Sequence, residues 1–169
     1  MRNTIVNAAA YALCAIVAAS TMSHRAAAQD KVRRGEYLAT IMDCSGCHTP
    51  GALAGNPDKR RSLAGSWIGF QIPDLGIFYP PNLTSDPETG LGTWSESDIV
   101  TAVRTGARPD GRVLVPVMPY HNYGRLTDAD ASALAAYLKS LKPIRNKAPQ
   151  IRGPGEAPTD PYLTVVIPK

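Results

Sequence analysis

Cysteine is scarce in this 169-residue sequence, which has three, at positions 14, 44 and 47. A framework of several disulfide bonds, such as small secreted domains use, is therefore excluded. Neither sign of charge dominates, because 18 basic residues face 14 acidic ones, and this composition does not favour a nucleic-acid-binding protein. Beyond residue 28 there is also no apolar run of the length that a transmembrane helix needs.

The one apolar run of note lies near the start, at residues 8–19. Arg2 precedes it, and the small residues 26–28 follow it as a suitable cleavage site. This pattern predicts a secretory signal peptide over residues 1–28, with an uncleaved anchor as the alternative. Cleavage would remove Arg2 and Arg25 but no acidic residue, which lowers the formal net charge from +4 to +2.

After cleavage only two cysteines remain, both in the pentapeptide Cys44-Ser45-Gly46-Cys47-His48. Two thiols three positions apart, followed directly by a histidine, form the attachment signature of c-type haem. Each thiol can add across one haem vinyl group to form a thioether, and the histidine can bind the iron from the same turn of chain. A zinc site would need a second Cys or Cys/His pair, and a thioredoxin-like redox pair needs a βαβ setting. The motif predicts one covalent haem c.

A first helix is predicted over residues 31–42, leading into this motif. Tyr37, Leu38, Ile41 and Cys44 recur at intervals of three and four, which places them on one helical face. Gly35 interrupts the helix; it either permits close approach of another helix or is tolerated near a frayed end.

Two further helices have clear boundaries. One begins after Ser95, a good N-cap, and ends at Gly106. The other begins after Thr127 and ends before Pro143. Its predicted apolar face has helical spacing and consists of Leu134, Tyr137, Leu138 and Leu141.

The rest of the chain is rich in proline and glycine. Residues 49–93 are predicted as long irregular loops, which a compact domain tolerates when a bound haem supplies the apolar core. Residues 29–143 thus form the predicted haem domain. Residues 144–169 form a proline-rich tail, predicted to be extended and either to wrap the domain or to be partly disordered.

A haem bound by the motif histidine has a second axial position. Met42 precedes the motif on the same helix and cannot readily reach the opposite face of the haem. Met118 lies far downstream between Pro116 and Pro119, which predict an extended strap that presents its side chain. Met118 is the preferred distal ligand; His121 and an open or water-bound position are the alternatives.

With these features the chain resembles class I cytochromes c. It is most similar to the haem modules in cytochrome c subunits of bacterial periplasmic alcohol, aldehyde and gluconate dehydrogenases. The matching stretches span roughly residues 35 to 143 and are Gly35-Glu36-Tyr37-Leu38, the haem motif, Pro81-Asn82-Leu83-Thr84-Ser85-Asp86 with Thr89-Gly90, Gly92-Thr93-Trp94-Ser95, Asp110-Gly111, Met118-Pro119-Tyr120, and Leu126-Thr127-Asp128 with Tyr137-Leu138.

The resemblance implies an all-α cytochrome c fold, with three to four helices and long loops wrapped around one covalent haem. It implies Cys44 and Cys47 as thioether links, His48 as the proximal iron ligand and Met118 as the distal one.

The resemblance also suggests that Asn82 and Trp94 lie near the haem as propionate or pocket contacts; a turn residue and a core aromatic are the alternatives. It further implies that the first and last helices cross at Gly35, with Tyr137 and Leu138 against Tyr37 or Leu38.

The implied function is single-electron transfer in the periplasm by a protein that is not itself an enzyme. A periplasmic dehydrogenase would be the electron donor, and an oxidase or another cytochrome the acceptor. Such subunits usually carry three haem modules and a membrane anchor, whereas this sequence has one module. We therefore expect a small carrier or a one-haem subunit. The alternatives are a haem enzyme or sensor with an exchangeable sixth iron ligand, and a scaffold subunit docked through its tail.

Overall fold

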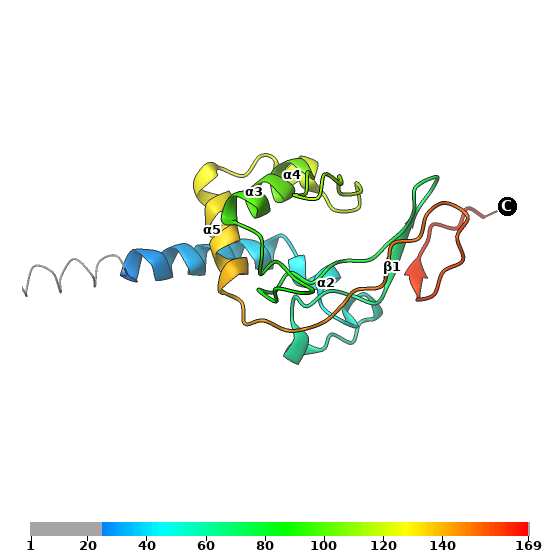
Figure 1. The fold of residues 1–169 in the computed structure, drawn as a ribbon, viewed down its shortest axis with the longest axis horizontal. Helices are drawn as coiled ribbons and strands as arrows, with labels where there is room; N and C mark the ends of the chain where they lie inside the picture. Colours follow the sequence, from blue (N-terminus) through cyan, green and yellow to red (C-terminus); the bar gives the residue numbers. More distant parts are fainter. Residues whose placement is uncertain (1–24, 169) are drawn as a thin grey trace, which may run out of the picture.

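The structure is a computed structural model, which describes residues 25–168. Figure 1 shows the helices on one side and a small sheet on the other, with the chain after the last helix running between them. Most of the predicted signal peptide, residues 1–24, lies outside the described residues. No helix between residues 25 and 168 has both the length and the apolar composition that crossing a membrane requires.

The described helical elements are residues 25–41, α2 (Cys44–His48), α3 (Glu96–Thr105), α4 (Tyr120–Tyr123), α5 (Asp128–Ser140) and the 3₁₀ turns η1 (Ala52–Ala54) and η2 (Lys59–Arg61). The strands are β1 (Gly69–Ile72), β2 (Gly76–Phe78) and β3 (Tyr162–Leu163).

The caps predicted for the two later helices are confirmed. Ser95 Oγ accepts a hydrogen bond from Asp98 N at 3.1 Å, and the Asp98 carboxylate accepts one from Ser95 N at 2.9 Å. This reciprocal capping box starts α3, and Gly106 ends it with a left-handed φ of 79°. Thr127 Oγ1 accepts from Asp130 N at 3.1 Å and starts α5.

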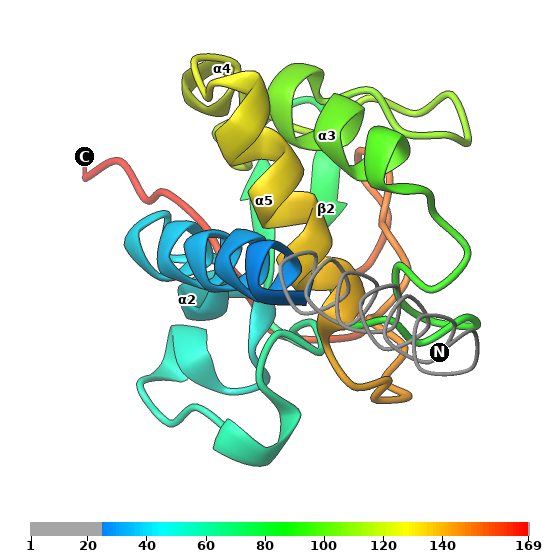
Figure 2. The ribbon, with the colours of Figure 1, turned by 90° about the vertical axis from the view of Figure 1, so that its left-hand side faces the viewer.

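The helix of residues 25–41 crosses α5, as Figure 2 shows. Gly35 lies at the contact between the two helices. A Cβ atom placed on Gly35 would overlap the carbonyl oxygen of Ala133 and would lie 2.6 Å from the Cβ of Tyr137. The glycine therefore permits a close approach between two helices, and the predicted crossing is confirmed.

The apolar face predicted for this first helix is not the face that the structure buries. Tyr37 and Ile41 are 53% and 59% exposed, whereas Leu38 and Ala39 are buried. The crossing at Gly35 sets the rotation of the helix, so the buried face follows residues 35, 38 and 39. The face chosen from hydrophobicity alone is therefore rotated by one residue from the face that is buried.

The core lies where α3 and α5 pack together and meet the loops. Its buried members are Ala39, Leu63, Leu91, Ile99, Val103, Leu134, Ala135 and Leu138. Lys139 of α5 closes one edge of this core by donating to the carbonyl oxygens of Leu91, Gly92 and Trp94 at 3.2, 2.8 and 2.8 Å. These bonds fix the loop that leads into α3.

A three-stranded sheet is a feature that the sequence did not predict. β1 and β2 form an antiparallel hairpin in which Phe70 pairs with Phe78, and β3 pairs with β1 in parallel, giving the order β2-β1-β3. Two residues of the hairpin turn have a positive φ, Asp74 (61°) and Gly76 (109°). The prediction that residues 49–93 contain only loops is wrong for residues 69–78.

The chain after α5 is extended and hydrogen-bonded to the domain. Asn146 Nδ2 donates to the Ala64 carbonyl at 2.7 Å, and Arg152 pairs with Ile77 of β2 in an antiparallel bridge. A Cβ on Gly76 would overlap the Arg152 carbonyl, so hairpin and tail are in close contact. Tyr79 Oη donates to the Asp160 carbonyl at 3.2 Å. Most of the tail is thus part of the folded structure.

Candidate functional site

The Cys-x-x-Cys-His motif forms its own short helix. The preceding helix ends at Ile41, and Asp43 takes a left-handed φ of 52°, which changes the direction of the chain. α2 then holds the whole motif from Cys44 to His48. Positions i and i+3 lie on the same side of a helical turn, so both thiols face one region.

The two thiols are free, partly buried and protonated at neutral pH. Burial is the main cause that raises the pKa of both thiols. It raises the pKa of Cys44 to about 11. A redox-active Cys-x-x-Cys pair needs a lowered thiol pKa, because the thiolate is the attacking species. This environment therefore does not favour the thioredoxin-like alternative and fits cysteines that are held for covalent attachment.

His48 is buried, with 7% of its surface exposed. Its Nδ1 lies 2.8 Å from the Pro81 carbonyl oxygen. A carbonyl oxygen only accepts, so Nδ1 carries the proton and the lone pair is on Nε2. Burial lowers the pKa of His48, an effect that the bond to Pro81 opposes. A neutral imidazole held in this tautomer is the form that binds a metal through Nε2.

Within residues 25–168, no three His, Cys, Asp or Glu side chains gather to form a metal site. The described residues therefore give no support to the zinc alternative, which needs four ligands. The donor set at α2 comprises two thiols and one histidine nitrogen, and it fits a covalently bound haem.

The side-chain amide of Asn82 is bound by protein groups, whereas the resemblance suggested a contact with a haem propionate. Its Nδ2 donates to Thr89 Oγ1 at 3.0 Å and to the Ile144 carbonyl at 2.7 Å. Its Oδ1 accepts from the N and the Oγ1 of Thr84 at 2.9 and 2.8 Å. Both amide hydrogens are engaged, so Asn82 has no N–H left for a propionate. Instead it fixes the loop whose Pro81 carbonyl orients His48.

Trp94, by contrast, lies at the border of the same apolar core as Cys44 and Met42. Its ring packs under the guanidinium of Arg108, with 5.0 Å between Cζ and the ring centroid. No hydrogen bond joins its indole N–H to another residue of the described chain. Trp94 therefore lies at the edge of the core beside Arg108.

The Met118 segment bends rather than forming the expected extended strap. Met118 N donates to the Val115 carbonyl at 3.0 Å, which closes a turn over Pro116, and α4 begins directly after Pro119. Met118 is partly buried, whereas His121 is exposed. Among residues 25–168, no hydrogen bond joins Met118 to His48.

Two residues that position the site gave no signal in the sequence. Pro81 orients His48 through its carbonyl oxygen, a backbone group that any residue carries. Tyr123 of α4 donates its hydroxyl to the Met42 carbonyl at 3.0 Å and so ties the segment after Met118 to the chain before the motif. Burial raises the pKa of Tyr123 to about 12, so this hydroxyl stays protonated.

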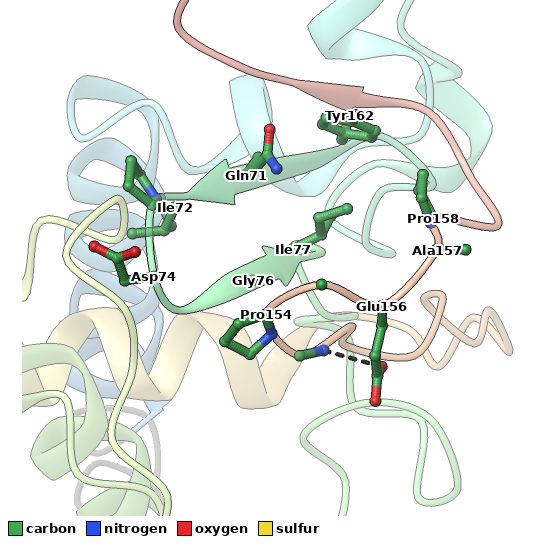
Figure 3. A pocket seen from close by; sticks show the side chains of 13 residues that line it. Gln71, Ile72, Asp74, Gly76, Ile77, Pro154, Glu156, Ala157, Pro158 and Tyr162 are labelled. Atoms are coloured by element: carbon green, nitrogen blue, oxygen red, sulfur yellow. Dashed lines mark hydrogen bonds between the residues drawn. The ribbon is translucent and has the colours of Figure 1, made fainter.

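A cavity of about 410 Å³ lies elsewhere, between the hairpin and the tail. Figure 3 shows Gln71 and Ile72 of β1, Ile77 of β2 and Tyr162 of β3 around it, together with the turn in which Gly153 N donates to Glu156 at 3.0 Å. None of the motif residues lines this cavity, so it is not the candidate site.

Comparison with known families identifies the domain. The profile of the cytochrome c family matches residues 32–142, which include α2, α3 and α5. The chain belongs to the cytochrome c family. It comprises one cytochrome c domain, mostly helical with a small sheet, and its single Cys-x-x-Cys-His motif is consistent with one covalent haem c.

The cytochrome c domain is similar to subunits of several dehydrogenases. It is 41% identical over 127 residues to the cytochrome c subunit of an alcohol dehydrogenase (quinone) of Gluconobacter oxydans (strain 621H), covering 73% of this chain and 24% of that protein. It is 37% identical over 125 residues to the cytochrome subunit of a fructose dehydrogenase of Gluconobacter japonicus, covering 73% and 24%.

A gluconate 2-dehydrogenase cytochrome c subunit of Pantoea cypripedii is 39% identical over 122 residues, covering 69% of this chain and 26% of that protein. The chain thus spans about a quarter of the length of these relatives. The resemblance to dehydrogenase cytochrome c subunits that the motifs indicated is confirmed.

Proposed function

We propose that this protein carries single electrons through one haem c, attached by Cys44 and Cys47 and bound axially by His48 and Met118. A bound haem c supplies a one-electron ferric/ferrous couple. The observation that carries the proposal is the buried, neutral His48, whose Nδ1 is held by Pro81 so that Nε2 is free to bind a metal. A fixed proximal ligand limits reorganisation when an electron arrives or leaves.

Met118 supports the same function from the distal side. It is partly buried, and the turn between Val115 and Pro119 restricts the backbone on both sides of it. A thioether is a soft ligand that favours ferrous iron and raises the reduction potential. The exposure of His121 makes it the weaker candidate.

Carbon monoxide binding distinguishes this function from the alternative of a haem enzyme or gas sensor. We expect the untreated ferrous protein to bind carbon monoxide only slowly or not at all, because Met118 occupies the sixth position. Stopped-flow absorption after mixing with carbon monoxide measures this directly. Rapid and complete binding at neutral pH would instead establish an exchangeable sixth position and favour the enzyme or sensor.

The partners follow from the names of the relatives, which are cytochrome subunits of dehydrogenases. We propose that the protein works in the periplasm, that its electron donor is a dehydrogenase and that its acceptor is an oxidase or another cytochrome of a respiratory chain. The predicted signal peptide over residues 1–28 supports this location. Transient redox partners dock through small interfaces near an exposed haem edge.

An exposed apolar segment supports docking on a dehydrogenase subunit. Val165, Val166 and Ile167 are 86%, 79% and 84% exposed and follow β3 after one intervening residue, Thr164. Isolated exposed apolar residues are common, but three consecutive β-branched ones beside an edge strand suit an added partner surface.

Deletion of residues 164–169 tests this role. Removal of the whole tail from residue 144 would also remove Ile144 and Asn146, which hold the loop near Asn82. We expect the shorter deletion to retain the haem spectrum and the unfolding midpoint but to lose co-purification with dehydrogenase activity. A variant with Val165, Val166 and Ile167 changed to serine is the matched control for chain length. Unchanged co-purification in both variants would contradict a docking tail.

A further inference from the structure

His48 is held from two sides by two different loops. Its ring Nδ1 lies 2.8 Å from the Pro81 carbonyl oxygen, in the loop that also contains Asn82. Its backbone carbonyl accepts a hydrogen bond from Gly65 N at 2.8 Å, in the loop that follows η2. The hydrogen bond that orients the imidazole therefore depends on how these two loops lie against each other.

The two loops are in direct contact. Ser66 N donates to the Pro80 carbonyl at 2.9 Å, and Leu83 N donates to the Leu63 carbonyl at 2.8 Å. Gly65 lies between these two bonds with a φ of 92°, and a Cβ atom on it would lie 3.1 Å from the Pro80 carbonyl oxygen. The backbones are this close only because the residue is a glycine. A shift of one loop would therefore displace the other.

The segment after α5 binds the loop that orients the imidazole. The Ile144 carbonyl accepts a hydrogen bond from Asn82 Nδ2 at 2.7 Å, and Ile144 N donates to Thr84 Oγ1 at 3.2 Å. Asn146 N donates to Thr89 Oγ1 at 3.1 Å. Three backbone groups of this segment thus fix the loop around Asn82, which is itself buried.

The side chain of Asn146 binds the other loop. Its Nδ2 donates to the Ala64 carbonyl at 2.7 Å, next to the residue whose N–H binds the His48 carbonyl, and Ala64 is fully buried. Its Oδ1 accepts only a long hydrogen bond of 3.4 Å from Arg61 on the exposed side. A buried carbonyl that loses its donor is costly, because water cannot easily replace the donor. Asn146 therefore joins both loops, one through its backbone and one through its side chain.

These contacts lie outside the part of the chain that the cytochrome c profile matches, which ends at residue 142. The later contacts of the tail serve another region, because Arg152 pairs with Ile77 of the hairpin and Asp160 accepts from Tyr79. Asn146 is thus the tail residue whose side chain contacts a loop that holds His48.

We propose that Asn146 is a positioning residue for the axial ligand His48, and that the segment directly after α5 supports the haem site. This inference rests on the proposed function, which supplies the iron. Asn146 acts through the two loops and keeps the Pro81 carbonyl in place for the Nδ1–H of His48. A hydrogen bond at Nδ1 makes the imidazole a more strongly donating ligand, which favours ferric iron. Loosening this bond therefore raises the midpoint potential.

The test compares the wild-type holoprotein with Asn146→Ala in two measurements. Spectroelectrochemistry gives the midpoint potential, and NMR of the ferrous protein gives the hydrogen-exchange rate of the His48 Nδ1–H. The amide of Leu134, buried in α5, reports global unfolding in the same experiment. We expect Asn146→Ala to raise the potential and to speed exchange at His48 about tenfold or more relative to Leu134, as the loss of one buried hydrogen bond implies. Asn146→Gln keeps an amide donor and should recover part of both effects.

A second pair of variants tests the same contacts from the opposite side. Thr89 Oγ1 accepts hydrogen bonds from both Asn146 N and Asn82 Nδ2. Thr89→Val removes this hydroxyl at nearly constant shape and should also raise the potential. Thr89→Ser keeps the hydroxyl and should remain close to the wild type.

Two control variants separate positioning from charge and from stability. Arg145→Gln changes the neighbouring residue, whose exposed side chain pairs with Glu88 at 2.8 Å. It should leave both measurements unchanged, because solvent screens the lost charge. Gly35→Ala weakens the contact with α5 instead. It should speed exchange at His48 and Leu134 alike and leave the potential unchanged.

Each outcome decides the proposal. An unchanged or lowered potential in Asn146→Ala would overturn the positioning role and leave the proposed function standing. Equal acceleration of exchange at His48 and Leu134 would show a purely structural role and overturn it as well. A wild type without methionine ligation would contradict the proposed function at Met118, whereas exchange at His48 would still decide the role of Asn146. Should Asn146→Ala not fold, Thr89→Val compared with Thr89→Ser decides by the same criteria.

Discussion

Met118→Ala is expected to abolish the weak red charge-transfer band of the ferric protein that marks methionine bound to haem iron. The same substitution should lower the midpoint potential by an amount on the order of 0.2 V, a fraction of the range of about 0.8 V that axial ligands span. It should also allow carbon monoxide to bind rapidly to the ferrous protein, because the sixth position is then open. Absorption spectra, a redox titration and stopped-flow mixing measure these three effects.

Met42→Leu is the matched control, because Met42 is the other methionine after residue 28. It packs against the core at the start of the motif, and its shape is nearly conserved by leucine. We expect it to retain the red band and the wild-type potential. If the band survives in Met118→Ala, or disappears in Met42→Leu, the assignment of Met118 as distal ligand is wrong. A wild-type protein without the band would point to His121 or to an open position.

Gly35→Ala is expected to destabilise the folded protein by about 1–3 kcal/mol, the usual cost of forcing an extra methyl group into a packed contact. The added Cβ would overlap the Ala133 carbonyl oxygen and crowd the Cβ of Tyr137, and a backbone carbonyl cannot rotate away. Alanine has the higher helix propensity, by up to about 1 kcal/mol, which offsets only part of this cost. Guanidinium unfolding of the holoprotein, followed by circular dichroism, measures the difference.

Glu36→Ala is the control for this change, because Glu36 is the next residue of the same helix and is exposed. An exposed substitution of this kind should alter the free energy of unfolding by no more than about 0.5 kcal/mol. Equal stability of Gly35→Ala and the wild type would show that the two helices can separate slightly at no cost. The tight crossing would then not be required for stability.

The helix boundaries show how far local sequence reasoning reaches. Ser95 and Asp98, Gly106 and Thr127 determine their helix ends through hydrogen bonds and φ values that involve neighbours within four residues. Such contacts are nearly independent of the rest of the fold, so they can be predicted from the chain alone. The rotation of the first helix cannot, because the crossing at Gly35 decides whether Tyr37 or Ala39 is buried.

The sheet was absent from the sequence-based prediction for a different reason. Residues 69–78 contain apolar and aromatic residues on both sides of Pro73-Asp74 and Gly76, which is a recognisable hairpin signal that the density of glycine and proline obscured. No local signal could have paired Gly69 with Tyr162, because the two are far apart in the sequence. That pairing depends on the path that the tail takes across the domain.

For the chemistry of the site, too, some features depend on neighbouring residues and others on the tertiary structure. Cys44, Cys47 and His48 determine by themselves that a haem can be attached, since the three groups are neighbours on one helical turn. The tertiary structure decides which nitrogen of His48 is free, because that depends on the Pro81 carbonyl contributed by a loop folded back from 33 residues away. It also decides that the side-chain amide of Asn82 is saturated by protein partners, because hydrogen-bond partners are set by packing.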